Sequence, residues 1–244
     1  MMAEEKAYFF KPYEPPKYQE GIKGIKILVL GASFYCSNQK CDHFKECTNE
    51  TKMNSISFND KCSDYIKNNY KLDQMPKIEI EGYRETHHIK SYAAFTLFMD
   101  YFLYKYKFIE EENFDLWDFV AFTNYVQFVL PHYETKSHNI IPKKYNKALE
   151  SIITEKQPNI VICWGGTINR PLWEHDKQDK ENTELLKNSE YYRFRWIVND
   201  QTIEFINPFH PSSNSFIMNY HAFEKYLLEV FQECEKKLKI STEY

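Results

Sequence analysis

Four short apolar runs, each followed directly by glycine or polar residues, constrain the fold of this chain more than any other feature. The runs cover residues 25–30, 119–123, 159–164 and 202–206, and the residues that follow them are Gly31, Asn124, Gly165 and Asn207. Runs of this kind are typical of strands buried on both faces of a sheet. Open parallel sheets bind their ligands at the carboxyl ends of the strands, so these loops are the first candidates for a functional site.

Helical patterns lie between the apolar runs. Apolar residues recur at helical spacing over residues 91–106, 143–155 and 220–238, and we expect these segments to pack on the sheet as helices. Residues 191–206 predict a β-hairpin that turns at Asn199 and Asp200, so the last core strand should have an antiparallel neighbour. The alternating patterns predict an α/β fold, a three-layer α/β/α sandwich with a central, mainly parallel four-stranded sheet.

The length of 244 residues favours a single domain whose core needs no disulfide bonds. Residues 1–20 are rich in proline and aromatic residues and lack helical or strand periodicity, and we interpret them as an N-terminal arm laid over the domain. Residues 21–244 are interpreted as the domain itself, with a long insert around residues 36–84. Long inserts usually carry function or disorder.

The charge balance excludes a strongly basic surface for nucleic acid. Lys and Arg number 31 against 35 Asp and Glu, a formal net charge of −4, which still allows a local basic cleft. No apolar stretch approaches the ~20 residues of a membrane span, and the chain starts with acidic residues where an export signal carries Lys or Arg. We therefore expect a protein that is not secreted and has no membrane partner, in the cytoplasm or associated with the nucleoid.

Four of the six cysteines fall in one stretch, and His43 lies among them. They are Cys36, Cys41, Cys47 and Cys62. Thiols of a non-exported protein are expected to be reduced, so this stretch is considered as a metal or redox site before it is considered as a disulfide framework. A structural zinc site prefers a tighter cysteine pair than this spacing offers. Metal ligands, redox or disulfide pairs and free thiols remain three interpretations, and no metal or other cofactor is assigned.

Four loops, taken in order along the chain, resemble those of the uracil-DNA glycosylase superfamily. They begin at Gly31, Thr123, Trp164 and His210 and have the sequences GASFY, TNYVQ, WGGT and HPSS. That family has a glycine-started loop after its first strand, an asparagine after its second, a glycine-containing turn after its third and a His-Pro-Ser loop after its fourth. The resemblance covers most of the chain, from Lys26 to about Phe231, and it rests on the joint order of the loops because each motif alone is common.

The resemblance implies a role for each matched residue. His210 would donate a hydrogen bond from a neutral imidazole to the base carbonyl, where negative charge develops as the base departs. Asn124 would read the edge of a flipped pyrimidine, since one carboxamide offers both a donor and an acceptor. Tyr35 would close the pocket against bulkier bases. Loop backbone around the pocket would come from Gly31, Gly165 and Ser212.

The first loop departs from the family pattern at Ser33. The best-known branches carry Asp or Asn at this position to orient or activate the attacking water, and a serine hydroxyl cannot act as a carboxylate base. Three alternatives follow: hydrolysis relies on stabilisation of the leaving group, a carboxylate such as Asp42 reaches the site, or the protein binds a base without cutting it. Phe34 offers a ring either for stacking on the base or for the core.

DNA, duplex or single-stranded, is the partner that the resemblance implies. A group of basic residues after the Asn124 loop either contacts the DNA backbone or belongs to solvated helix faces: Lys136, His138, Lys143, Lys144 and Lys147. A role in genome repair or against modified foreign DNA suits the resemblance equally.

The expected function is an enzyme, a DNA glycosylase-like hydrolase that cleaves the N-glycosidic bond of a flipped uracil or modified pyrimidine. The expected catalytic residues are His210 and Ser33, and the expected base-binding residues are Asn124, Phe34 and Tyr35. The alternative is a non-catalytic nucleic-acid or nucleotide-binding module of the same fold.

Overall fold

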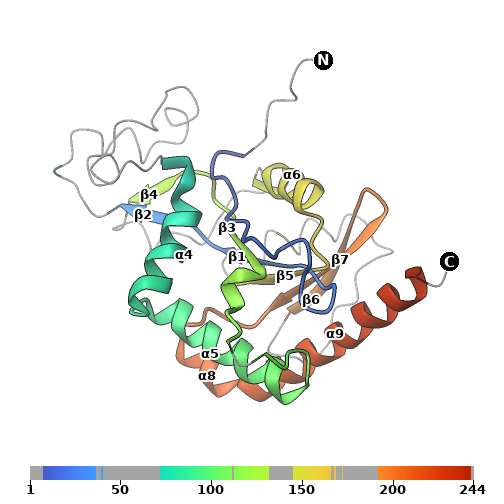
Figure 1. Ribbon diagram of the computed structural model, residues 1–244. Helices are drawn as coiled ribbons and strands as arrows, with labels where there is room; N and C mark the ends of the chain where they lie inside the picture. Colours follow the sequence, from blue (N-terminus) through green and yellow to red (C-terminus); the bar gives the residue numbers. More distant parts are fainter. Residues whose placement is uncertain are drawn as a thin grey trace.

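The computed structural model describes residues 8–36, 40, 72–111, 113–131, 145–165, 168, 172 and 192–242. A five-stranded sheet in the order β3-β1-β5-β7-β6 forms the centre of this part of the chain (Figure 1). The strands are β1 (Ile27–Gly31), β3 (Val120–Asn124), β5 (Ile160–Cys163), β6 (Tyr192–Val198) and β7 (Gln201–Asn207). Because β3, β1, β5 and β7 are parallel, their carboxyl ends share one edge of the sheet.

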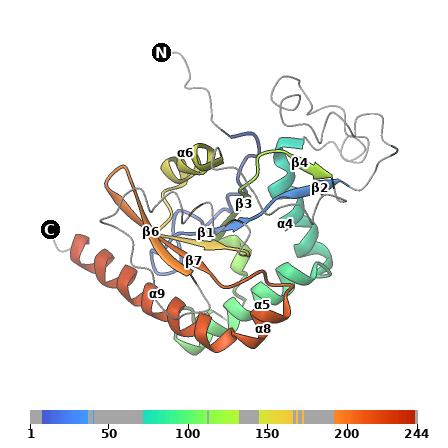
Figure 2. The same cartoon turned by 180° about the vertical axis from the view of Figure 1, so that it is seen from behind.

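Helices cover both faces of the sheet, as Figures 1 and 2 show from opposite sides. Ile27 and Val29 of β1 face one core cluster, which α4, α5 and α9 complete. Leu28 and Leu30 face the other cluster, which α6 completes. The three-layer α/β/α sandwich predicted from the sequence is therefore confirmed. The helices are α4 (Met75–Thr86), α5 (Lys90–Lys105), α6 (Asn146–Lys156), α8 (Asn214–Met218) and α9 (Tyr220–Thr242).

The sheet has five strands rather than the predicted four because the β6–β7 hairpin adds its first strand to the edge. β6 pairs antiparallel with β7, as the hairpin pattern predicts. Asn199 and Asp200 have φ values of 51° and 63°, the left-handed conformation that a two-residue hairpin turn requires. Asn and Asp tolerate this conformation better than most residues, so the turn is encoded locally.

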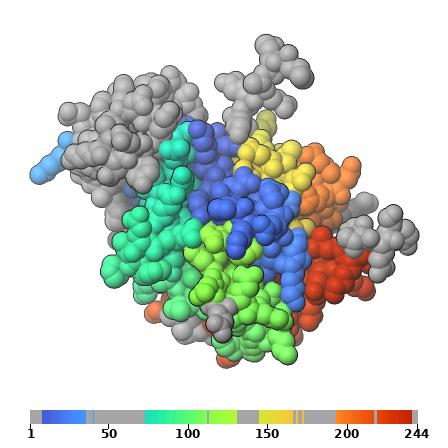
Figure 3. Space-filling model, in the orientation of Figure 1, coloured from blue at the N-terminus to red at the C-terminus, as the bar shows by residue number. Residues whose placement is uncertain are grey.

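The described part of the N-terminal arm, residues 8–20, lies against the opposite edge of the sheet. Tyr13 forms an antiparallel bridge with Phe122 of β3, and the side chains of Phe10 and Tyr18 are fully buried. In Figure 3 these first described residues, in dark blue, fill the surface between α4 and α6. The arm therefore covers the β3 edge, which would otherwise expose unpaired backbone groups.

Part of the stretch interpreted as an insert belongs to the core. Within residues 36–84, the structure describes η2 (Leu72–Gln74) and most of α4. Ile80 and Tyr83 of α4 are buried in the same cluster as β1 and β3. Helix α4 ends where His87 adopts a left-handed conformation, with φ of 53°. The last part of the predicted insert, α4, therefore packs on the central sheet as part of the hydrophobic core.

A second, two-stranded sheet extends the loops that leave β1 and β3. It pairs β2 (Phe34–Cys36) parallel to β4 (Val129–Pro131), and the sequence analysis did not predict it because each strand has three residues. A short helix, η3 (Leu116–Asp118), leads into β3. Among the described helices, none combines the length and the apolar composition needed to cross a membrane.

Candidate functional site at the carboxyl edge of the sheet

Asn124 and Gly31 lie side by side at the carboxyl ends of β3 and β1. They are partners in the parallel register, and the Asn124 carboxamide occupies the space above Gly31. A Cβ atom at position 31 would lie 2.1 Å from Asn124 Oδ1. Asn124 is only 3% exposed. The carboxamide is therefore held over β1, toward the middle of the edge.

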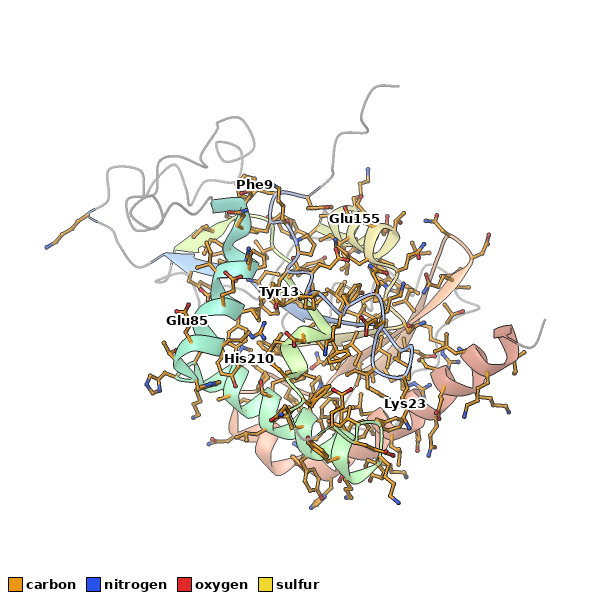
Figure 4. All side chains as sticks on the ribbon, viewed as in Figure 1. Phe9, Tyr13, Lys23, Glu85, Glu155 and His210 are labelled. Atoms are coloured by element: carbon orange, nitrogen blue, oxygen red, sulfur yellow. The ribbon has the colours of Figure 1, made fainter. Side chains whose placement is uncertain are left out.

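His210 lies on the other side of the same edge, in the loop that follows β7. Its ring meets the Trp164 ring edge-to-face, with centroids 6.2 Å apart, and a Cβ atom at Gly165 would touch His210 Cβ at 3.5 Å. His210 therefore leans over the end of β5, while Asn124 leans over β1. Figure 4 labels His210, which projects near the junction of α4 and α5 in that view.

The hydrogen bonds of His210 fix its tautomer. The Ser212 backbone N–H donates to His210 Nδ1 at 3.3 Å, and Ser212 Oγ lies 2.7 Å from the same nitrogen. Since Nδ1 accepts a hydrogen bond, the proton of the neutral ring is on Nε2. Burial lowers the pKa of His210 from its usual range. The ring is therefore a neutral Nε2–H donor near pH 7.

Asn207, the last residue of β7, holds the His210 loop to the turn after β5. Its Nδ2 donates to the Gly165 carbonyl at 2.8 Å, and its Oδ1 accepts from the Phe209 N–H at 2.9 Å. Phe209 has φ of 67°, a conformation that is rare for a bulky residue, and Gly165 has φ of 104°. The buried Asn207 carboxamide therefore stabilises an unusual backbone path immediately before His210.

Ser33 follows β1 in the first loop. Its hydroxyl oxygen is buried and has no hydrogen-bond partner within the described part of the chain. The same is true of Trp164 Nε1, whose ring also packs against Tyr92 and Phe95 of α5. Buried polar atoms without partners are rare and call for a ligand or water. With Thr123 Oγ1, which is also buried without a partner in the described part of the chain, three such atoms lie at this edge.

Phe34 and Tyr35 differ in their environment. Phe34 packs edge-to-face on Phe10 of the N-terminal arm, with ring centroids 4.9 Å apart, and belongs to the core cluster. Tyr35, the next residue of β2, is 40% exposed. Phe34 thus has the surroundings of a core ring, whereas Tyr35 is partly exposed at the surface.

Several residues singled out in the sequence lie outside the described residues. They are Asp42, His43, Cys41, Cys47, Cys62, Lys136, His138, Lys143 and Lys144. Lys147 is described and is exposed on α6. Within the described ranges, no group of three His, Cys, Asp or Glu side chains is arranged to hold a metal ion.

Two cavities formed by described residues share no residue with this edge. One, of about 500 Å³, lies between the N-terminal arm and α4 and is lined in part by Tyr13, Lys77 and Lys156. The other, of about 770 Å³, lies beside α5 and is lined in part by Asp100 and Asp115. The site is therefore assigned from its polar groups and its place at the carboxyl ends of parallel strands.

Two residues that shape this edge, Asn207 and Gln127, have no role among the sequence-based predictions. Asn207 directly follows the apolar run of residues 202–206, and this position was the one sequence feature that could have indicated its role. Gln127 lies within the TNYVQ loop, and its contacts depend on the N-terminal arm, which no local pattern relates to it.

Comparisons with known proteins assign no family to this chain. No protein-family model matches the sequence, and no curated protein matches it either.

Proposed function

We propose that the protein is a DNA glycosylase-like enzyme that hydrolyses the N-glycosidic bond of a flipped uracil or modified pyrimidine. The observation that carries this proposal is the state of His210. Its Nδ1 is occupied by the Ser212 loop, so the neutral ring offers Nε2–H at the edge where Asn124 also lies. A donor paired with an edge-reading carboxamide is the combination that cleavage of a base requires.

His210 would act on the leaving group. As the bond between the anomeric carbon and the base nitrogen breaks, the electron pair departs with the base and the charge spreads to its carbonyl oxygen. A hydrogen bond from Nε2–H to that oxygen strengthens as the charge grows, so it lowers the barrier. Burial keeps the imidazole neutral, and a neutral donor stabilises the anion without first losing a proton to it.

Asn124 would select the base. A pyrimidine presents a carbonyl acceptor next to a ring nitrogen, and the carboxamide offers a donor and an acceptor in matching positions. Because Asn124 is packed over Gly31, little freedom remains for the carboxamide to lose on binding, which favours selectivity.

Ser33 would hold the attacking water rather than deprotonate it. Its buried hydroxyl has no partner among the described residues and is suited to accept from or donate to one water molecule. A sugar cation is electrophilic enough to react with neutral water. The water oxygen bonds to the anomeric carbon and its proton is released, which leaves a free base and an abasic sugar.

The same hydroxyl supports the second candidate, a non-catalytic module that binds a flipped base. Without a carboxylate at position 33, water activation is weaker than in an enzyme with a dedicated base. In that case His210 and Asn124 would serve recognition alone.

A panel assay separates the two candidates. DNAs that carry uracil, other damaged bases or bulky modified pyrimidines, single-stranded and duplex, are incubated with the parent chain, His210→Ala and a control, His221→Ala, whose side chain is 93% exposed. If the protein is a glycosylase, the parent and the control should produce abasic sites, and His210→Ala should produce about 10²–10³-fold fewer. If the parent chain binds the DNA in a salt-sensitive manner and none of the three proteins produces abasic sites, the result would support the non-catalytic binding module.

A further inference from the structure

We propose that the N-terminal segment from Phe9 to Tyr13 supports the base site, and that Gln127 is the positioning residue through which it holds Asn124. The segment is far from the strand-end loops in sequence, and Figure 4 labels its two ends. The assignment of a base as the ligand rests on the proposed function, whereas the contact between the arm and Asn124 does not.

The Gln127 carboxamide joins the arm to Asn124 through both its oxygen and its nitrogen. Its Oε1 accepts from the backbone N–H groups of Phe9 and Phe10, at 3.1 and 3.0 Å. Its Nε2 donates to the backbone carbonyl of Asn124 at 2.6 Å. Gln127 is 8% exposed, so these hydrogen bonds form where water competes little, and losing one leaves a buried group unsatisfied.

The arm is anchored firmly enough to serve as a support. Tyr13 and Phe122 exchange two backbone hydrogen bonds, at 2.8 and 3.1 Å, and the Tyr13 hydroxyl donates to the Trp117 carbonyl. An isolated antiparallel bridge thus ties the arm to β3, the strand that ends in Asn124.

The arm also contacts the first loop. Phe10 is fully buried and packs on Phe34, two residues after Ala32. The loop after β3 is bonded to the same stretch, since the Tyr125 and Val126 N–H groups donate to the Gly31 and Ala32 carbonyls. The arm therefore supports the first loop and the loop that contains Asn124, and its position affects how a ligand meets the Asn124 carboxamide.

A substitution that removes one donor tests this inference. In Gln127→Glu, the ionised carboxylate still accepts from Phe9 and Phe10 but cannot donate to the Asn124 carbonyl. When protonated at lower pH, the carboxyl group regains a donor and resembles the glutamine again. Gln201→Glu is the matched control, because Gln201 also donates to a backbone carbonyl, that of Pro158 at 3.2 Å, at the far side of the fold.

The first measurement is the side-chain amide resonance of Asn124 in asparagine-labelled protein, assigned by comparison with Asn124→Ala. We expect this resonance to move in Gln127→Glu at pH 8, to return toward its parent position at pH 5, and to stay in place in Gln201→Glu. An unmoved Asn124 resonance in folded Gln127→Glu would overturn the inference. Phe9→Pro, which removes one N–H from the arm side, is expected to move the same resonance if Gln127→Glu does not fold.

The second measurement is cleavage of the substrate DNA. We expect Gln127→Glu to raise KM about tenfold at pH 8, the change that corresponds to one hydrogen bond, with recovery at lower pH and a smaller change in kcat. A moved Asn124 resonance in a chain whose parent cuts no DNA would support the arm contact and count against the proposed function. A moved resonance with unchanged KM in an active enzyme would overturn the role of the arm in supporting the base site.

Discussion

Asn124 Oδ1 occupies the position that a side chain on Gly31 would need: a Cβ atom there would lie 2.1 Å from that oxygen. Gly31 does not have the left-handed φ that would itself require glycine. The need for glycine at this position therefore comes from a side chain on the neighbouring strand.

Gly31→Ala is expected to displace the Asn124 carboxamide. Overpacking of this kind destabilises a protein by about 1–3 kcal/mol. The double variant Gly31→Ala with Asn124→Ala should recover most of this loss, because it removes the closest contact. Urea unfolding of the parent, both single variants and the double variant measures the coupling between the two positions. Additive free energies of unfolding would show that the two side chains do not compete for this space.

Asn207→Ala is expected to raise the pKa of His210 toward its usual value near 6.5. The variant loses the hydrogen bonds to the Gly165 carbonyl and the Phe209 N–H, so the loop opens and water reaches the ring. Histidine NMR titration measures this pKa directly. Asn159→Ala is the control, because Asn159 accepts from the Lys26 N–H at the opposite end of the sheet. An unchanged His210 titration in folded Asn207→Ala would contradict the prediction.

The lowered pKa of His210 also makes stability depend on pH. The unfolded chain binds a proton at higher pH than the folded chain does. The stability that comes from keeping the His210 ring neutral is therefore fully present at pH values above the pKa of His210 in the unfolded chain. It is lost as pH falls from that pKa to the lower pKa of His210 in the folded chain. His210→Ala should remove this part of the pH dependence.

Asp100→Asn is expected to stabilise the protein at pH 8 and not at pH 4. Burial, with a smaller effect of Asp115, raises the pKa of Asp100 to about 6. Ionisation in the folded state therefore costs stability as pH rises from about 4 to 6. Since the side chain is partly exposed, screening limits the effect to about 1 kcal/mol, a Tm increase of about 2–4 °C. Asp200→Asn, in the hairpin turn, is the control, and equal Tm changes at both pH values would refute the prediction.

Glu204→Gln is expected to destabilise the fold by about 3–5 kcal/mol, because it removes one partner of a buried ion pair. Glu204 of β7 is 1% exposed and accepts from Arg193 Nε at 3.2 Å and from Arg195 Nε at 2.6 Å. Glu233→Gln, whose side chain is 42% exposed and bonds the same two arginines, should cost less than about 1 kcal/mol. Equal losses in urea unfolding would contradict this difference.

Much of the fold could be predicted from the sequence because the decisive signals are local. The apolar runs fix the strands, and the Asn199–Asp200 turn fixes the hairpin, since both residues take the left-handed conformation that it needs. The β2–β4 pair escaped prediction because three-residue strands carry no periodicity. Most of α4 was not predicted because it directly follows the cysteine stretch, and the two were interpreted together as one insert.

The candidate site was predictable only in part, for a different physical reason. Asn124 ends β3 and His210 lies in the loop that follows β7, and the topology of a parallel sheet brings both to one edge. The contacts that hold them are long-range: Asn207 reaches Gly165 across 42 positions, and Gln127 reaches Phe10 across 117. No local pattern indicates such contacts, and they appear only when the chain is folded.

The measurement that tests the central claim most directly is product analysis in water enriched in a heavy oxygen isotope. The parent chain is incubated with the DNA panel, and mass spectrometry follows the free base and the sugar. The proposed function predicts equal amounts of free base and abasic sugar, with one solvent oxygen on the anomeric carbon, and about 10²–10³-fold less of both products with His210→Ala. Base retained in every DNA, with the parent chain bound and folded, would contradict it.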